Sequence, residues 1–148
     1  MKLVFTKSSG KYDLMEVFRQ SGEPERVNCP KQGIIPHDMV HYAVEHTLQT
    51  RGFLGRVKDG EDPGFQMHPE AHSDAVERLV EVFQADAWSG GASGAQDMID
   101  MYRVSCMARD CPVLPIDTNA IDAVRLAITE LSERWQATPI GGTLELEL

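Results

Sequence analysis

The end of the chain constrains its fold more than any other segment. Residues 143–148 read TLELEL, so leucines alternate with polar and acidic residues through Leu148. A period of two is typical of a β-strand that buries one face and exposes the other. A strand with this pattern needs partner strands to complete a sheet, and we expect them from the start of the chain.

Two segments near the N-terminus are suited to that role. Residues 2–6, KLVFT, and residues 12–20 read as strands, joined by the turn KSSGK at residues 7–11. A short helix is the alternative for the second segment, because Leu14, Val17 and Phe18 also fit a 3.6-residue period. An isolated hairpin is only marginally stable, so the C-terminal strand is expected to extend it.

The middle of the chain has the period of helices. The first is expected from Pro36 to about residue 50, and the second from near Ser73. A third spans residues 95–109, and a fourth runs from Thr118 or Asn119 to just before Pro139. Residues 52–69 and 89–94, which are rich in glycine, are expected to be loops. The 148 residues therefore predict a single α+β domain over 1–148, a small antiparallel sheet packed against three to four helices.

Charge and composition narrow the range of partners. The formal net charge of -9 argues against binding nucleic acid or an anionic membrane, since both require a basic surface. No stretch has the length and hydropathy of a secretory signal or a membrane span. The acidic surface and the helix that contains Met98, Met101 and Met107 are suited to a protein partner or a homo-oligomer.

The cysteines indicate the cellular compartment. Their odd number, three, and the absence of a signal predict free thiols in a reducing cytoplasm. Cys106 and Cys111 are five residues apart, outside the i, i+4 spacing of a shared helix face. We expect them, with Cys29, to be core or surface thiols.

The histidines carry the strongest chemical signal. His37 and His41 form an H-D-x-x-H sequence, and His68 and His72 repeat the four-residue spacing. Residues four apart share a helix face, so each pair is suited to present two imidazoles to one divalent ion, such as zinc. Glu45 continues the ridge of His37 and His41, but it lies two turns from His37. We expect it to orient His41 if one ion does not reach both ends.

This pattern predicts a divalent-metal site and, by extension, a metal-dependent hydrolase. His37 and His41 would hold the ion, His68 or His72 would supply a third ligand, and Asp38 would act as general base on a bound water. H-D-x-x-H is one methylene shorter than the H-E-x-x-H of zinc hydrolases, so the base would lie farther from the water. The alternative is a non-enzymatic interaction or regulatory protein with structural histidines.

Two further segments resemble a known group of sequences. The stretch IPHDMVHYAVEHTLQTRGFLGRVKDGEDPGF and the tail RWQATPIGGTLELEL are similar to a family of small bacterial proteins of unknown function. The shared features are a P-H-D-x-x-H-Y-x-V-E stretch, a following G-F-x-G, and a C-terminal tryptophan before G-G-x-L-x-L. The resemblance covers about a third of the chain. It implies a complete small protein and carries no activity, cofactor or mechanism.

Overall fold

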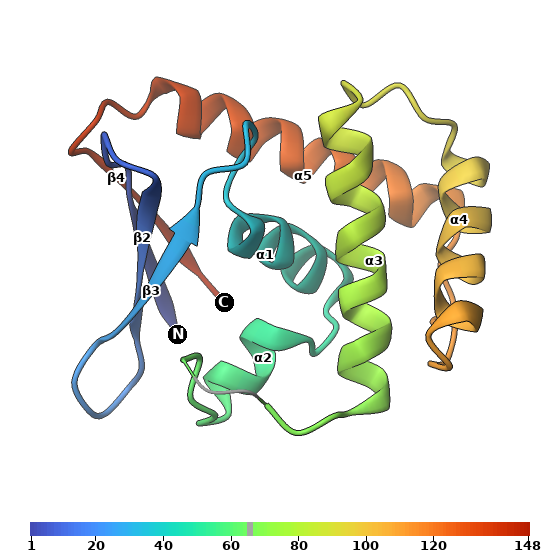
Figure 1. Cartoon of the computed structure of the whole chain (residues 1–148), viewed down its shortest axis with the longest axis horizontal. Helices are drawn as coiled ribbons and strands as arrows, with labels where there is room; N and C mark the ends of the chain where they lie inside the picture. Colours follow the sequence, from blue (N-terminus) through green and yellow to red (C-terminus); the bar gives the residue numbers. More distant parts are fainter. Residues whose placement is uncertain (65–66) are drawn as a thin grey trace.

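The computed structural model describes residues 1–64 and 67–148, and it has a small sheet at one end of a group of helices (Figure 1). Its strands are β1 (Lys2–Thr6), β2 (Tyr12–Phe18), β3 (Glu25–Pro30) and β4 (Thr143–Glu147). Its helices are α1 (His37–Leu48), α2 (Phe53–Lys58), α3 (Ala71–Trp88), α4 (Ala95–Ala108) and α5 (Thr118–Ala137). This arrangement confirms the α+β prediction.

The sheet joins the two ends of the chain. Its strand order is β3-β2-β1-β4, and every neighbouring pair is antiparallel. β1 lies between the hairpin partner and the C-terminal strand, which confirms that TLELEL extends the N-terminal hairpin. Residues opposite each other in register share a face, and the buried face is formed by Leu3, Phe5, Met15, Val17, Leu144 and Leu146.

α1 is the central helix. It packs against α2, α3 and α5, and in Figure 1 it lies between the sheet and α3. Val40 and Val44, one turn apart on α1, are fully buried. His41 and Glu45, on the adjacent ridge of the helix, are also buried at 2 % exposure, because neighbouring elements surround the helix on several sides.

Two elements were not predicted. β3 is an edge strand in which only Cys29 is fully buried, so its alternation of Val27 and Cys29 with polar residues is too short to identify a strand from the sequence. α2 lies within residues 52–69, which we expected to be a loop; residues 65 and 66 of that segment lie outside the described residues. Among the described helices, none is long and apolar enough to cross a membrane.

Candidate metal centre

The start of α1 fixes the positions of two imidazoles. Pro36 has the extended conformation of the residue that precedes a helix, with φ -52° and ψ 146°, so His37 is the first helical residue. His41 follows one turn later on the same face. Their rings meet edge to face with centroids 4.8 Å apart. The sequence prediction that these two side chains lie together is therefore confirmed.

A third donor comes from α3, which packs beside α1. Glu77 Oε2 lies 2.7 Å from His41 Nε2, and Glu77 Oε1 lies 3.2 Å from His37 Nε2. One ligand atom from each of these three residues lies within 4.8 Å of the other two. The cluster could therefore hold a metal ion, and we call it the His37/His41/Glu77 cluster.

Both imidazoles are fixed at their other nitrogen. His37 Nδ1 donates to Gln84 Oε1 at 2.6 Å, and His41 Nδ1 donates to Glu45 Oε2 at 3.0 Å. These bonds set the orientation of each ring and direct both Nε2 atoms toward Glu77. Metal-bound histidines usually have this arrangement, with one nitrogen on the ion and the other donating to a carboxylate or carbonyl oxygen.

Glu45 is itself fixed by the backbone that opens α2. Its Oε1 accepts from the N–H groups of Gly52 at 2.7 Å and Gly55 at 2.8 Å, and its Oε2 accepts from Leu54 N–H at 3.1 Å. A helix leaves its first N–H groups without intrahelical acceptors, so a buried carboxylate there satisfies them and favours the helix dipole. Glu45 therefore joins α1, α2 and the cluster, in the orienting role that its distance from His37 predicted.

The two carboxylates change the protonation of the histidines. Burial alone would lower the pKa of His41, but its bonds to Glu45 and Glu77 outweigh burial and raise this pKa to about 10. Burial likewise opposes charge on His37, yet its bonds with Glu77 and Gln84 raise its pKa. The pKa of Glu77 is lowered: burial opposes ionisation, and the hydrogen bonds from the two histidines exceed that effect. Without an ion, the cluster is therefore an ion pair of imidazolium and carboxylate.

The structure places the other predicted site residues elsewhere. Asp38 follows His37 on the helix but points to the sheet, where its Oδ2 lies 3.4 Å from Cys29 Sγ. His72 Nε2 lies 2.9 Å from Thr50 Oγ1 at the surface. His68 is exposed, and its carbonyl accepts from Arg56. Among the described residues, neither His68 nor His72 joins the cluster, and Glu77 occupies the position of the third donor.

Sequence reasoning missed Glu77 and Gln84. They lie seven residues apart, which is about two helical turns, so they share one face of α3 beside the apolar ridge of Val76 and Val80. Polar residues at the margin of a buried ridge are ordinary on any amphipathic helix. Only the packing of α3 against α1 distinguishes this pair.

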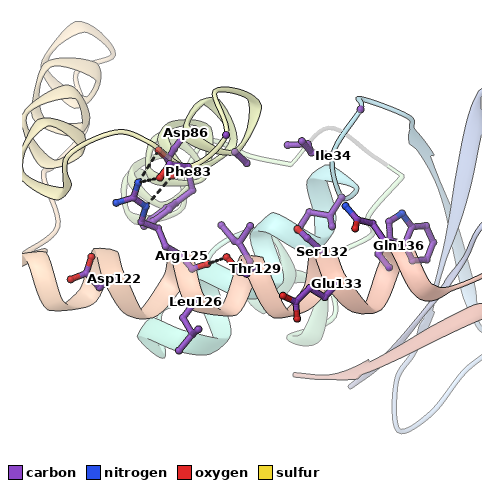
Figure 2. A pocket seen from close by; sticks show the side chains of 17 residues that line it. Ile34, Phe83, Asp86, Asp122, Arg125, Leu126, Thr129, Ser132, Glu133 and Gln136 are labelled. Atoms are coloured by element: carbon purple, nitrogen blue, oxygen red, sulfur yellow. Dashed lines mark hydrogen bonds and ion pairs between the residues drawn. The ribbon is translucent and has the colours of Figure 1, made fainter.

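A large hollow lies away from the cluster. Residues of α5, the end of α3 and the loop around Ile34 line it (Figure 2). Its volume is about 810 Å³. The cation at its wall, Arg125, is already paired with Asp86 at 3.1 Å, and its guanidinium also donates to Gly91 O. None of the three cluster residues lines this hollow. The hollow is therefore separate from the His37/His41/Glu77 cluster, and its size says nothing about the chemistry of the cluster.

Comparison with known proteins adds no further assignment: no family model, curated protein or solved structure matches this chain.

Proposed function

We propose that this protein binds a divalent transition-metal ion, such as zinc, through His37 Nε2, His41 Nε2 and the carboxylate of Glu77. The observation that carries the proposal is that both imidazoles are fixed at Nδ1 and present Nε2 to the same carboxylate. Two histidines and one glutamate form a recognised zinc ligand set. Imidazole nitrogen also suits iron, nickel and copper, so the ligand set alone does not choose among these ions.

The distances fit an ion after small adjustments. Ligands about 2.0–2.2 Å from a tetrahedral zinc are roughly 3.4 Å from one another. The two histidine–glutamate separations are 2.7 and 3.2 Å, and the most distant pair of donor atoms is within 4.8 Å. An ion would replace the protons that now lie between Glu77 and the imidazoles, so binding would release protons.

One side of the cluster is open to solvent. The side chains of His37 and Glu77 are 37 % and 31 % exposed, whereas that of His41 is 3 % exposed. An ion with three protein ligands would therefore keep a coordination position for water. Since a bound metal lowers the pKa of such a water toward neutrality, we extend the proposal to metal-dependent hydrolysis. Asp38 has no part in this proposal, because its carboxylate contacts Cys29.

The competing function is structural. The same three residues form an ion pair between α1 and α3 in which only His41 is buried, and the raised pKa of His41 is consistent with a pair that is favourable without an ion. A non-enzymatic protein would need nothing more from these histidines. Metal titration separates the two functions. In a metal site the added ion displaces the protons of the cluster and binds, whereas in a purely structural ion pair no ion binds.

Glu77→Gln is the most informative variant. It preserves the size of the side chain but removes the anionic ligand and one of the two oxygens that face the imidazoles. Glu81→Gln is the matched control, since Glu81 lies one turn later on α3 and pairs with Arg78 instead of the histidines. Each protein would be purified without a histidine tag, stripped with EDTA, and titrated with zinc, iron(II), nickel and manganese by calorimetry and elemental analysis.

We expect about one ion per chain in the wild type and in Glu81→Gln, with a tenfold or greater loss of affinity in Glu77→Gln. Circular dichroism would verify that all three proteins are folded. Failure of the folded wild type to bind any of these ions would contradict the proposal, as would equal binding by Glu77→Gln. Hydrolytic assays with ester and phosphoester substrates would follow on the loaded protein, with the stripped protein as blank.

A further inference from the structure

Cys106 and Cys111 are brought together by the way α4 ends. The helix stops at Ala108, and Asp110 takes the left-handed conformation with φ 52°. The chain then turns back, so that Cys111 N–H donates to Cys106 O at 3.0 Å. This six-residue closure is typical of a helix C-terminus. A continuous helix would have separated the two side chains, which is why the five-residue spacing did not predict their proximity.

The two thiols lie on a fixed frame. With Arg109 as the C-cap of α4, Cys106 is the third-last helical residue and Cys111 the second residue beyond the cap, two positions whose side chains frequently contact one another at this kind of helix end. Tyr102 is held from two sides, because its hydroxyl donates to Ala75 O at 3.1 Å and accepts from Leu114 N–H at 3.2 Å. Tyr102 thereby ties α4 to α3 and to the segment that follows Cys111. The thiols are therefore adjacent through the fold rather than through a mobile tail.

We propose that Cys106 and Cys111 are a reversible oxidation site that closes to an intramolecular disulfide. Cys111 is half-buried, whereas Cys106 is fully buried behind it. The exposed member of such a pair meets the oxidant first, and the buried member completes the bond. Both residues lie at the end of α4, in a part of the molecule separate from the His37/His41/Glu77 cluster, so the inference does not depend on metal binding.

The oxidant is a low-molecular-weight disulfide such as oxidised glutathione. The Cys111 thiolate attacks one sulfur of this disulfide, the S–S bond breaks, and the first small thiol leaves with a proton. The Cys106 thiol then gives up its proton and attacks the Cys111 sulfur of the mixed disulfide, and the second small thiol leaves. Two protein thiols are oxidised by two electrons, and one small disulfide is reduced to two thiols.

The short loop between the two cysteines favours a disulfide that thiols reduce readily. A disulfide stabilises a protein partly by closing a loop, and this effect shrinks as the loop shortens. Here the loop spans only residues 106–111, so the stabilisation that resists reduction is small. The disulfide would add a covalent link between α4 and the segment that Tyr102 already holds, and small thiols would remove that link again.

Cys29 provides an internal comparison. It is 2 % exposed within the sheet, and burial together with the neighbouring Asp38 raises the pKa of its thiol well above the usual range. Both effects suppress the thiolate that reacts with disulfides. Cys106 is equally buried and burial raises its pKa too, but it has the half-buried Cys111 beside it in the chain to react first; Cys29 has no such partner and should remain reduced.

Peptide mapping tests the proposal directly, because trypsin cleaves after Arg103 and Arg109 and so places Cys106 and Cys111 in different peptides. EDTA-treated, folded protein would be equilibrated in buffers of graded reduced and oxidised glutathione, quenched with iodoacetamide, digested and analysed by mass spectrometry. The peptide that contains Cys29 is a third and separate fragment. Cys111→Ser is the test variant and Cys29→Ser the matched control.

We expect a cross-link between peptides 104–109 and 110–125, with loss of two of the three alkylatable thiols and full recovery in dithiothreitol. Cys29→Ser should give the same cross-link, and Cys111→Ser should give none and keep Cys106 reduced. Accumulation of Cys111 as a stable glutathione adduct beside a free Cys106 would overturn the proposal. A cross-link that involves Cys29, or one that joins two chains, would also overturn it.

Discussion

Replacing Glu45 by glutamine tests whether this carboxylate organises the centre of the molecule. Its two oxygens accept four hydrogen bonds, from the N–H groups of Gly52, Leu54 and Gly55 and from His41 Nδ1. Glutamine has a similar size and shape but offers only one oxygen. Its NH₂ group must then face either the pair of donors at Oε1 or the pair at Oε2.

The cost follows from the number of donors left without an acceptor. If the amide oxygen serves Gly52 and Gly55, the NH₂ group faces Leu54 N–H and His41 Nδ1. The imidazole can lose the Nδ1 proton and accept from the amide, but Leu54 N–H has no such alternative. A buried donor without a partner costs about 1–3 kcal/mol, so we expect a loss of about 1–3 kcal/mol if the ring adapts and about 2–6 kcal/mol if both donors are orphaned.

Urea unfolding of EDTA-treated protein, followed by circular dichroism, measures this loss. The midpoint should fall while the slope stays near that of the wild type, because the same surface is exposed on unfolding. Glu130→Gln is the control, since Glu130 is exposed on α5 and its replacement should change stability by less than about 0.5 kcal/mol. If Glu45→Gln unfolded at the same urea concentration as the control, the carboxylate would not be holding α2, and the argument would fail.

Three other predictions concern the same region. In Gly52→Ala the new Cβ would lie 2.5 Å from Val76 Cγ1, so thermal unfolding should show a loss of about 1–3 kcal/mol, whereas Gly10→Ala, with open space, should lose far less; equal losses would contradict this. The pKa of His41 is raised to about 10, so its ion pair stabilises the fold fully below the unfolded pKa of about 6.5, and this stability is lost as the pH rises toward 10. The pKa of Glu77 is lowered, so its contribution to stability is complete above the ordinary pKa of about 4.5 and is lost as the pH falls below that value. Urea midpoints of the metal-free protein should therefore peak between about pH 4.5 and 6.5, and the alkaline decline should be weaker in Glu77→Gln; the same decline in both proteins would refute it. Zinc at about 100 times its Kd should add about 2.7 kcal/mol to the wild type and much less to Glu77→Gln, and a calorimetric melt unmoved by zinc would argue against a site in the folded state.

The secondary structure that could be predicted was the part determined by local patterns. Alternation in residues 143–148 identified β4, and Pro36 marked the start of α1 to the residue. α2 could not be predicted, because its six residues include Gly55 and its first N–H groups are satisfied by Glu45, a residue on another helix. A short helix with this composition depends on tertiary contacts, and local propensity does not contain them.

The candidate site also has features that local sequence patterns predicted and features that depend on tertiary packing. The proximity of His37 and His41 and the pairing of His41 with Glu45 depend only on the geometry of one helix, so spacing was sufficient to predict them. Glu77 and Gln84 belong to α3, and which of its residues meet α1 depends on how the two helices pack. The spacing of His68 and His72 was equally regular in sequence, but His72 lies in the first turn of α3 and His68 precedes that helix in a loop.

Glu45 also explains why the cluster is suited to exchange an ion without rearranging the core. The ring of His41 is buried and fixed at Nδ1 by a carboxylate whose remaining bonds all go to the backbone of α2. Nε2 of His41 can face either a proton shared with Glu77 or a metal ion. In both cases the bonds that orient the ring, from Nδ1 to Glu45 and from Glu45 to the backbone of α2, stay intact. The side chains of His37 and Glu77 are half-exposed, and His37 is held at Nδ1 by the side chain of Gln84 rather than by the backbone. In the proposed metal site, a rigid buried ligand beside two half-exposed ones would let an ion replace the proton through movements on the solvent side alone.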